Sequence, residues 1–505
     1  MKIFAACSMA ILVFFSGYMP SQADTEYQQV IGIIHMDSEV SGGDNTLEML
    51  AAVARNADAG LAIITDHDTQ KATYGMWPLR NILRVSHSRA SIRQYGISKY
   101  LDEIAEIDRD MEDFVYIPGI EAVPYYCWTR NPLDNVLSLQ NIHRHVLIMG
   151  LEEPEQIKKL PSIEAGYPSR VTRESLLGAL WVIPLLIAFF LYKPQKQSYS
   201  HYDSWFTSLI SRPSNLIALP MMIVSVVFLF NNFPFKKPVV DQYRSDAGAK
   251  PFQEVIDYVN REGGLLFWAH PESSYQQHLG SEQGNPLVSL LLKMIFKDGF
   301  EIRTDPYYKL LNETHDYTGF AIFWEGYTYV GNPGGLWDSL LLQFCRGTRE
   351  RPVWAIAELD MEEGTDPEAA SEVQTVFLVT EKTKEAYLDA LRKGRIYCFT
   401  NNLTRDVTIR DYSVYADGKR AVSGELIGYA KDANLTLDLE FTGKDLNLEV
   451  FVVSDGGILS RKRISASGTM IFPLPEPEDE MGYVRVAIYQ NDSMRIATNP
   501  IFFLK

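Results

Sequence analysis

The chain has few cysteines for its length. Only four occur among 505 residues, Cys7, Cys127, Cys345 and Cys398, and no two of them stand in a C-x-x-C spacing. A zinc ribbon needs paired cysteines and a disulfide scaffold needs many of them, so both are excluded. The spacing leaves one disulfide among the last three cysteines as an open alternative.

The chain also lacks an excess of positive charge. It has 47 lysines and arginines against 64 aspartates and glutamates, which gives a net charge of −17. Binding to DNA or RNA without regard to sequence needs a basic face that displaces counterions, so we expect no nucleic-acid partner. An anionic substrate would be repelled unless bound cations reverse the local charge. The apolar content of 46% is typical of an ordered globular chain, here long enough for two or three domains.

Uncharged apolar segments occur at three places. The first lies within residues 1–23, after Lys2 and before small residues at 21–23, which is the pattern of an export signal or an uncleaved anchor. The other two cover residues 175–192 and 215–235, and each is close to the length that crosses a bilayer. We therefore expect a transmembrane helical hairpin within residues 171–237; two buried helices of a soluble domain are the alternative.

The hairpin fits the distribution of candidate metal ligands. His145 precedes it and His270 follows it, so both lie on one side of a membrane only if the chain crosses an even number of times. Lys193, Lys196 and Arg212 favour a cytoplasmic connection, whereas the cations that flank the hairpin argue the opposite. With the export signal, the sequence predicts a protein of the bacterial inner membrane whose catalytic domain is periplasmic.

Elsewhere helical and strand patterns alternate. Helical spacing over residues 46–56, 251–261 and 383–393 is followed each time by glycine and a short apolar run, which predicts an α/β fold with a mostly parallel sheet or barrel. After about residue 400 the runs are short, alternating and separated by Gly, Asp and Asn. This predicts a small all-β sandwich over residues 401–505, whose protein partner, if it has one, the sequence does not reveal.

Several apolar runs end in residues that bind metals. The runs lead into His35, the triplet Asp66-His67-Asp68, Glu121, His270 and Asp360. Runs of this length and composition are typical of buried strands. Because the loops that follow parallel strands of a barrel converge at one mouth, we expect these side chains to form one polynuclear metal site.

Local spacing strengthens this interpretation. His35 and Asp37 stand at i and i+2, where extended backbone turns both side chains to the same side, and Asp360 and Glu362 repeat the spacing. The triplet Asp66-His67-Asp68 places three consecutive ionisable residues after a buried strand, which is costly unless they serve a site. A polar turn is the alternative. His145 differs, since it precedes an apolar run.

These motifs resemble those of the PHP domain, a family named for polymerase and histidinol phosphatase. Its H-x-H, T-D-H, G-x-E, isolated His, H-P and D-x-H elements correspond, in order, to residues 33–37, 65–67, 119–121, 145–147, 270–271 and 360–362. The resemblance implies a distorted TIM-like (β/α) barrel made of residues 24–170 and 238–400. It also implies two or three divalent metal ions (Mn, Fe, Zn or Mg) and hydrolysis of a small phosphorylated substrate.

The resemblance carries the ligand role to His35, His67, Glu121, His145, His270 and Asp360, and the predicted ligand set adds Asp37 and Glu362. Asp37 and Glu362 stand where the family has histidine, and Gly42 stands where it has an acidic residue. Either the site persists with oxygen ligands that favour Mn, Mg or Fe over Zn, or it is degenerate. In the second case the chain would be a ligand- or partner-binding module at the membrane.

For an enzyme, we expect a phosphoesterase that uses a metal-activated hydroxide. Glu121 is the predicted bridge between metals, His67 a ligand, and Asp66 a residue that orients a ligand histidine. Arg80 and Arg84 begin a basic run that is predicted to bind substrate phosphate, although a solvated face or contact with anionic lipid is the plainer alternative. Hydrolysis of amide or lactone bonds is a third alternative.

Overall fold

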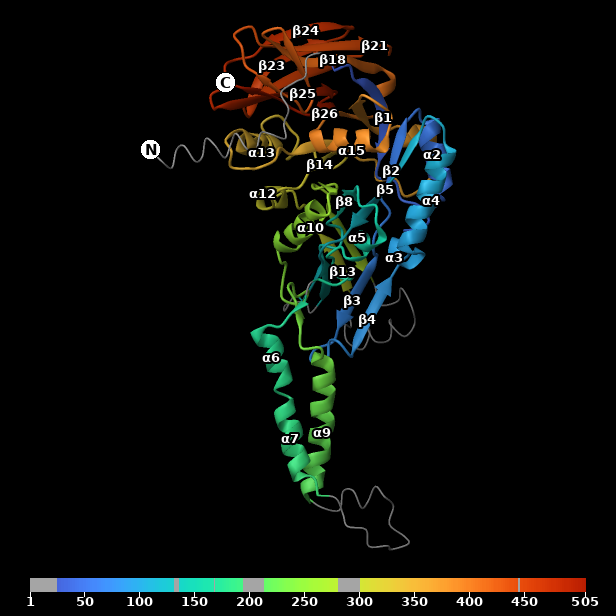
Figure 1. Cartoon of the computed structure of the whole chain (residues 1–505), viewed down its shortest axis with the longest axis vertical. Helices are drawn as coiled ribbons and strands as arrows, with labels where there is room; N and C mark the ends of the chain where they lie inside the picture. The colour runs from blue at the N-terminus through green and yellow to red at the C-terminus, as the bar shows by residue number, and fades with distance from the viewer. Residues whose placement is uncertain (1–24, 131–135, 168, 194–212, 280–299, 444–445) are drawn as a thin grey trace, which may run out of the picture.

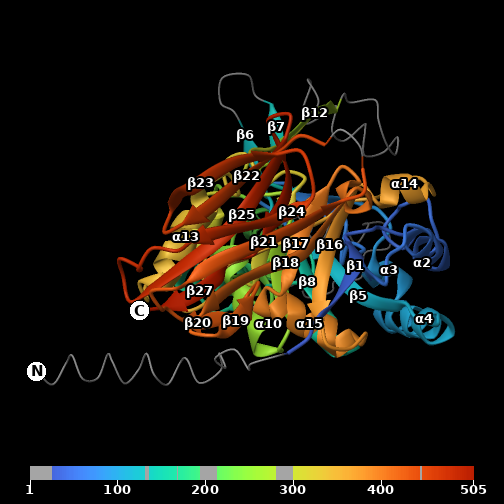
Figure 2. The same ribbon diagram turned by 90° about the horizontal axis from the view of Figure 1, so that it is seen from above.

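The computed structural model describes residues 25–130, 136–167, 169–193, 213–279, 300–443 and 446–505. The predicted export signal at residues 1–23 lies outside the described residues. A β-rich body carries a pair of long helices that project from one end of it (Figure 1). The C-terminal strands lie at the opposite end of the body (Figures 1 and 2).

A mixed sheet forms the centre of the body. Its order over this part is β15-β14-β11-β8-β5-β2-β1-β16. The strands are β1 (Gln28–Ile34), β2 (Leu61–Ile64), β5 (Val115–Ala122), β8 (Val146–Met149), β11 (Leu265–Trp268), β14 (Gly319–Phe323), β15 (Trp354–Ala357) and β16 (Val373–Val379). All of them run in one direction except β8 and β16, which are antiparallel to their neighbours. The parallel majority agrees with the predicted α/β fold.

The two ends of this run approach each other through side chains. The backbone N–H of Ala357 in β15 donates to Oγ1 of Thr375 in β16 at 3.0 Å, and that hydroxyl donates to the Ala357 carbonyl at 3.1 Å. The barrel that the resemblance implies is therefore not a ring of strands joined throughout by backbone ladders.

Helices begin and end where the sequence patterns place them. Thr46 and Thr383 cap α2 and α15 by accepting from backbone N–H groups, and Gly394 ends α15 with a left-handed φ of 72°. The helices of the body are α2 (Leu47–Asn56), α3 (Ile92–Tyr95), α4 (Ile97–Asp110), α5 (Pro154–Lys158), α10 (Lys250–Arg261), α12 (Leu310–Glu313), α13 (Leu336–Cys345), α14 (Pro367–Ala370) and α15 (Lys384–Lys393). The expected helices near 46–56, 251–261 and 383–393 correspond to α2, α10 and α15.

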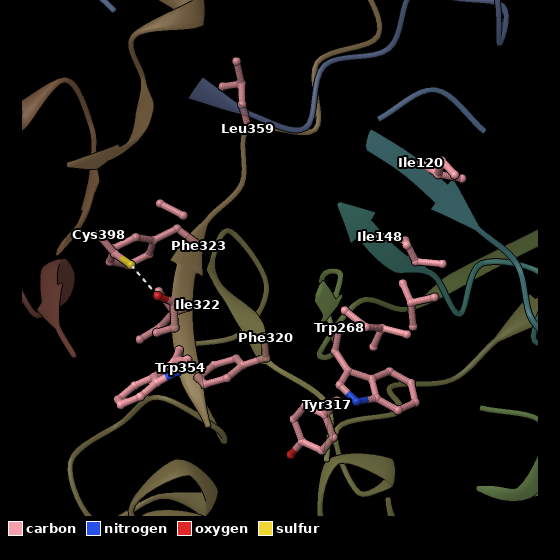
Figure 3. Close-up of a cluster of buried hydrophobic side chains, with 14 of the residues drawn as sticks. Ile120, Ile148, Trp268, Tyr317, Phe320, Ile322, Phe323, Trp354, Leu359 and Cys398 are labelled. Carbon is pink, nitrogen blue, oxygen red and sulfur yellow. Dashed lines mark hydrogen bonds between the residues drawn. The ribbon is translucent and has the colours of Figure 1, made fainter. Parts of the chain in front are cut away.

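Large aromatic side chains fill the space beside β11, β14 and β15. Trp268, Phe320 and Trp354 are buried there, and the Cys398 thiol donates to the Ala355 carbonyl at 3.4 Å (Figure 3). Three cysteines, Cys127, Cys345 and Cys398, are free and buried. The disulfide that the sequence left open among them is therefore not formed.

Three small sheets lie outside the central sheet, in the part of the body nearer to the long helices. They are the hairpin β3 (Lys71–Gly75) with β4 (Arg84–Ser88), the pair β9 (Ser169–Arg170) with β10 (Lys237–Pro238), and the sheet of β6 (Cys127–Arg130), β7 (Leu137–Gln140), β13 (Phe300–Thr304) and β12 (Tyr275–Leu279). The β3–β4 hairpin ends beside the base of the long helices (Figure 1), and the β9–β10 pair joins the residues just before and just after those helices.

The C-terminal all-β region is present, but its first sheet continues the central one. β16 pairs with β17 (Ile396–Thr400), and β17 pairs with β26 (Ser493–Thr498). Beyond β26 the sheet continues through β25 (Met481–Gln490), β22 (Leu448–Ser454) and β23 (Gly457–Ile464). β27 (Ile501–Leu504) also pairs with β25, and β20 (Leu426–Gly428) pairs with β27. A second sheet contains β19 (Lys419–Val422), β18 (Val407–Ala416), β21 (Asn434–Phe441) and β24 (Gly468–Pro473). The predicted boundary at residue 400 thus falls at the end of a strand that both parts share.

Two long apolar segments form the projecting pair. They comprise α6 (Arg173–Ala179) with α7 (Val182–Leu191), and α9 (Pro213–Asn232). Their mean hydropathy is 2.1 and 2.0, and only 11% and 17% of their most apolar windows are buried. The rings of Trp181 and Phe228 stack at 4.2 Å between them. Both segments are long and apolar enough to cross a membrane, and neither is a core helix of the body.

Candidate metal centre

The predicted ligands lie at one edge of the central sheet because of the strand directions. His35 follows β1, His67 follows β2, His270 follows β11 and Asp360 follows β15, whose carboxyl ends share an edge. His145 precedes β8. Since β8 is antiparallel to β5 and β11, its amino end lies at that same edge, so a residue before this strand reaches the same site.

Glu121 near the end of β5 lies among three histidines. Its Oε2 is 3.2 Å from Nε2 of His67 and 3.3 Å from Nε2 of His35, while its Oε1 contacts Nδ1 of His145. His67, Glu121 and His145 form one group that could hold a metal ion. One carboxylate oxygen thus faces His67 and His35, and the other faces His145.

Two more groups share His35. Its Nε2 is 3.8 Å from Asp37 and 3.5 Å from the exposed Asp360, and these three residues form the second group. The third contains His35, His270 and Glu358. A parallel bridge between Met36 and Met361 holds the two i, i+2 motifs side by side, so their shared spacing reflects neighbouring places in the fold.

Glu358 was missed by the sequence reasoning. It is buried, its Oε2 lies 3.0 Å from Nδ1 of His35, and its Oε1 lies 3.3 Å from Nδ1 of His270. The same oxygen accepts the backbone N–H of His270 at 2.6 Å. Its signal was a lone carboxylate inside the apolar run over residues 353–359, where an unpartnered charge would be costly.

Burial and the charges of neighbouring groups strongly shift the pKa values of the clustered histidines and glutamates. Burial opposes ionisation of Glu121, but His145, His67 and His35 hold its pKa well below the usual range. Burial would lower the pKa of His35, yet Glu121 and Asp360 raise it well above normal. Burial lowers the pKa of His67 to about 4. Burial would raise the pKa of Glu358, but hydrogen bonds from His270 and His35 lower it to about 2. Burial would lower the pKa of His270, but its contact with Glu358 raises it to about 9.

Several buried polar atoms fit a cation. Among the residues that the structure describes, His35 Nε2 and Asp37 Oδ2 lack hydrogen-bond partners, and Glu121 Oε1 and His145 Nδ1 have no partner apart from each other. Such atoms are rare in folded proteins because each loses its hydration without compensation. Imidazole nitrogens and carboxylate oxygens are the ligands that Mn, Fe, Zn and Mg accept, so the donor set fits one or more divalent ions.

The backbone is strained at three of the predicted ligands. His35, His270 and Asp360 have φ values of 73°, 22° and 54°. Residues other than glycine seldom adopt positive φ, and each instance costs on the order of 1–3 kcal/mol. Such conformations at the ends of three different strands are typical of a functional site.

Asp66 is fixed to the loop that carries Asp37. It accepts from the Ser38 backbone N–H at 2.8 Å and from the Ser41 hydroxyl at 2.6 Å. The Ser41 hydroxyl also lies 3.4 Å from Asp37. These hydrogen bonds join Asp66 to the loop after β1 rather than to a histidine, so the loop is the part of the site that Asp66 orients.

The packing of the same loop explains Gly43, which follows Gly42, the position where the PHP family has an acidic residue. A Cβ on Gly43 would lie 2.4 Å from the Asp37 carbonyl oxygen and 3.0 Å from the Glu362 carbonyl oxygen. The N–H of Asp44 donates to that Glu362 carbonyl at 3.1 Å. Glu362 thus contacts the loop through its backbone, and its exposed carboxylate belongs to none of the three groups found among the described residues.

The basic run is distributed over two places. Arg80 lies in the turn between β3 and β4, with its guanidinium 3.9 Å above the ring of Tyr243, and Arg84 begins the exposed β4. Arg93 donates to the carbonyls of Ile157 and Lys158, which fixes it to the body. Arg80 and Arg84 thus lie in a hairpin that leaves the site rather than within the ligand groups.

Comparisons with known proteins give only distant matches. No protein-family model and no curated protein matches the chain. A two-domain protein from Bacteroides vulgatus, containing a predicted PHP-like metal-dependent phosphoesterase, is similar over 96% of this chain and 98% of its own, with 10% identity and a TM-score of 0.34. A chain from Bifidobacterium adolescentis with the provisional name of metal-dependent phosphoesterase is similar over 68% and 90%, with 14% identity and a TM-score of 0.24. These names agree with the resemblance seen in the motifs, but at such TM-scores the similarities carry no argument about this chain.

Proposed function

We propose that the chain is a metal-dependent phosphoesterase. The observation that carries the proposal is the buried Glu121, whose two oxygens face histidines from different strands. His67 and His145 would hold one divalent ion with Glu121, and His35 and Asp37 would hold another. His270 and Asp360 complete the edge.

Each residue has a role that follows from its contacts. When bound, divalent ions neutralise phosphoryl oxygens and lower the pKa of water. Glu358 accepts from Nδ1 of His35, which leaves Nε2 of that ring to face Glu121. Ser38 and Ser41 hold Asp66, and through this loop Asp37 is kept beside His35.

Asp37 supports a retained site over a degenerate one. The family has histidine at this position, yet the Asp37 carboxylate lies within the ligand group of His35 and Asp360. Burial and the nearby Glu121 raise its pKa well above normal. A cation would remove this unfavourable charge density, which is the expected property of a ligand.

The projecting helices would anchor the enzyme in a membrane. Their outward side chains are apolar, with Phe190, Ile217 and Phe230 among the most exposed. Such a surface would be unfavourable in water and is typical of contact with lipid. With the predicted export signal, this supports an envelope enzyme whose body is periplasmic.

Metal content and hydrolysis together test the proposal. The purified protein should contain at least one equivalent of Mn, Fe, Zn or Mg and should hydrolyse an aryl phosphate. Glu121→Gln should lose both properties. His87→Ala, which removes an exposed histidine of β4, is the matched control and should lose neither. A wild-type protein that binds no metal and shows no activity after incubation with these ions would contradict the proposal and favour a binding module.

A further inference from the structure

The β3–β4 hairpin connects the metal site to the base of the projecting helices. Its root lies at the site, because the N–H of Ile92 donates to the carbonyl of His67 and the N–H of Arg89 donates to that of Gln70. Its turn lies at the end of α9, where Asn81 donates from its backbone N–H to Oδ1 of Asn231 at 3.0 Å and from Nδ2 to the Asn231 carbonyl at 2.6 Å. Figure 1 shows this hairpin running from the body to the base of α9.

The segment after α9 is bound to the same side of the site. The hydroxyl of Tyr243 accepts the N–H of Gly75 at 2.6 Å, and that of Tyr125 donates to the carbonyl of Ser245 at 2.8 Å. Asp246 pairs with Arg144 at 2.9 Å. Tyr125 lies four residues after Glu121, and Arg144 lies next to His145. The edge of the sheet that carries the ligands therefore faces the helical anchor.

Exposed apolar side chains surround this base. Trp77 in the β3–β4 turn is 79% exposed, and Ile82 and Leu83 of the same turn are exposed too. Val171 and Phe233 are exposed at the base of the helical pair, just before α6 and just after α9. Tryptophan is enriched at the interface between membrane and water, where its ring contacts both phases. One exposed apolar residue needs no explanation, but this set lies where two exposed apolar helices begin.

Positive charge gathers at the same level although the whole chain is acidic. Arg84, Arg170, Arg173 and Lys236 are exposed beside the base of the helices. Exposed cations next to a membrane attract anionic head groups at about 1 kcal/mol per charge. Apolar side chains at the interface and cations around them fit an anionic bilayer surface.

The length of the β3–β4 hairpin limits what can reach the metals. Its five-residue strands span about 17 Å at the usual rise of a strand. The polar layer of a leaflet is only about 5–8 Å thick. A phosphate attached directly to a lipid backbone would therefore stay near the turn of the hairpin, whereas one at the end of an extended polar head group would approach the root of the hairpin beside the site.

We propose that the substrate is a phosphate monoester at the end of an extended polar head group of a membrane lipid. This rests on the proposed phosphoesterase function and names its substrate class. Water forms a new bond from its oxygen to phosphorus, and the bond between phosphorus and the head-group oxygen breaks. That oxygen takes up a proton from the water, so the products are the lipid with a free hydroxyl and inorganic phosphate.

The test compares one phosphate in three settings with the full-length protein in lipid vesicles. The substrates are a glycolipid phosphorylated on its terminal sugar, the same phosphorylated sugar without acyl chains, and phosphatidic acid. We expect kcat/KM for the glycolipid to exceed both others at least tenfold. Equal or lower values overturn the inference while hydrolysis of an aryl phosphate leaves the phosphoesterase function standing. Failure to hydrolyse any of these compounds, aryl phosphate included, overturns both.

Substitutions separate a membrane surface from a purely structural hairpin. Trp77→Ala combined with Ile82→Ser should reduce the ratio of glycolipid to aryl phosphate hydrolysis at least fivefold. Ile471→Ser, at an exposed position of β24 in the C-terminal region, is the matched control and should leave the ratio unchanged. An unchanged ratio in the double variant would contradict the proposed orientation.

Discussion

Glu358 should control both metal affinity and the stability of the metal-free protein. It contacts Nδ1 of His35 and of His270 from a fully buried position. Removing a residue that orients metal ligands lowers metal affinity or activity by about 10–100-fold, or about 1.4–2.8 kcal/mol. We therefore expect Glu358→Gln to bind Mn or Zn at least tenfold more weakly in a competition assay with a chromophoric chelator.

The metal-free protein provides the second part of this prediction. A pKa of His270 raised from 6.5 to about 9 corresponds to about 3 kcal/mol of stabilisation, an upper value because Asp360 and Glu121 share it with Glu358. Because the folded pKa is raised, this stabilisation is complete below pH 6.5 and is lost as pH rises through about 9. The Glu358 pKa is lowered to about 2, so its contribution is present above pH 4.5 and is lost as pH falls through about 2.

Thermal unfolding of the metal-free protein between pH 5 and 10 measures this directly. Wild type should become less stable from pH 6.5 to 9, and Glu358→Gln should start lower and lose less over that interval. Glu363→Gln changes an exposed neighbour and serves as the control. Wild-type metal affinity together with a wild-type pH profile in Glu358→Gln would refute the role assigned to this carboxylate.

Four further outcomes follow from contacts already described. Glu121→Gln should reduce bound metal by at least one equivalent in elemental analysis, because both of its oxygens face histidines. Gly43→Ala should lower the free energy of unfolding by about 1–3 kcal/mol in denaturant titrations, since its Cβ has no room, whereas Gly428→Ala meets no atom within 4 Å and should change it little. Arg485→Ala should cost about 3–5 kcal/mol in the same assay, because it leaves the buried Asp338 without its charge partner at 2.6 Å. A sodium carbonate wash should leave the full-length protein in the membrane pellet; its release would contradict the membrane anchor.

The sequence predicts the ligands better than their arrangement. His35, His67 and His270 are recognisable because each follows a short apolar run, and strand ends of that kind meet at one edge. The place of His145 in the site can be understood only once β8 is known to be antiparallel. That direction depends on the pairing of β8 with β5 and β11 and not on the local sequence pattern.

Three features lay beyond sequence reasoning for physical reasons. Glu358 is hidden inside an apolar run, because a buried carboxylate is tolerated there only with its two histidine partners, which come from distant strands. The pairing of Tyr397 with Thr498 joins residues about a hundred positions apart, and no local propensity specifies such a contact. The Asp66 contacts with Ser38 and Ser41 likewise depend on how two loops pack.

The strand shared by both parts of the body has a consequence for attempts to shorten the protein. Val376, Leu378, Tyr397 and Phe399 of β16 and β17 pack into the hydrophobic core of the C-terminal region. A truncation after residue 400 would strip these side chains of their cover and leave β17 with an open hydrogen-bonding edge, a combination that promotes aggregation. Since β16 also pairs with β1, the strand that precedes His35, the last hundred residues serve as a structural support of the ligand edge and cannot be treated as a removable appendage.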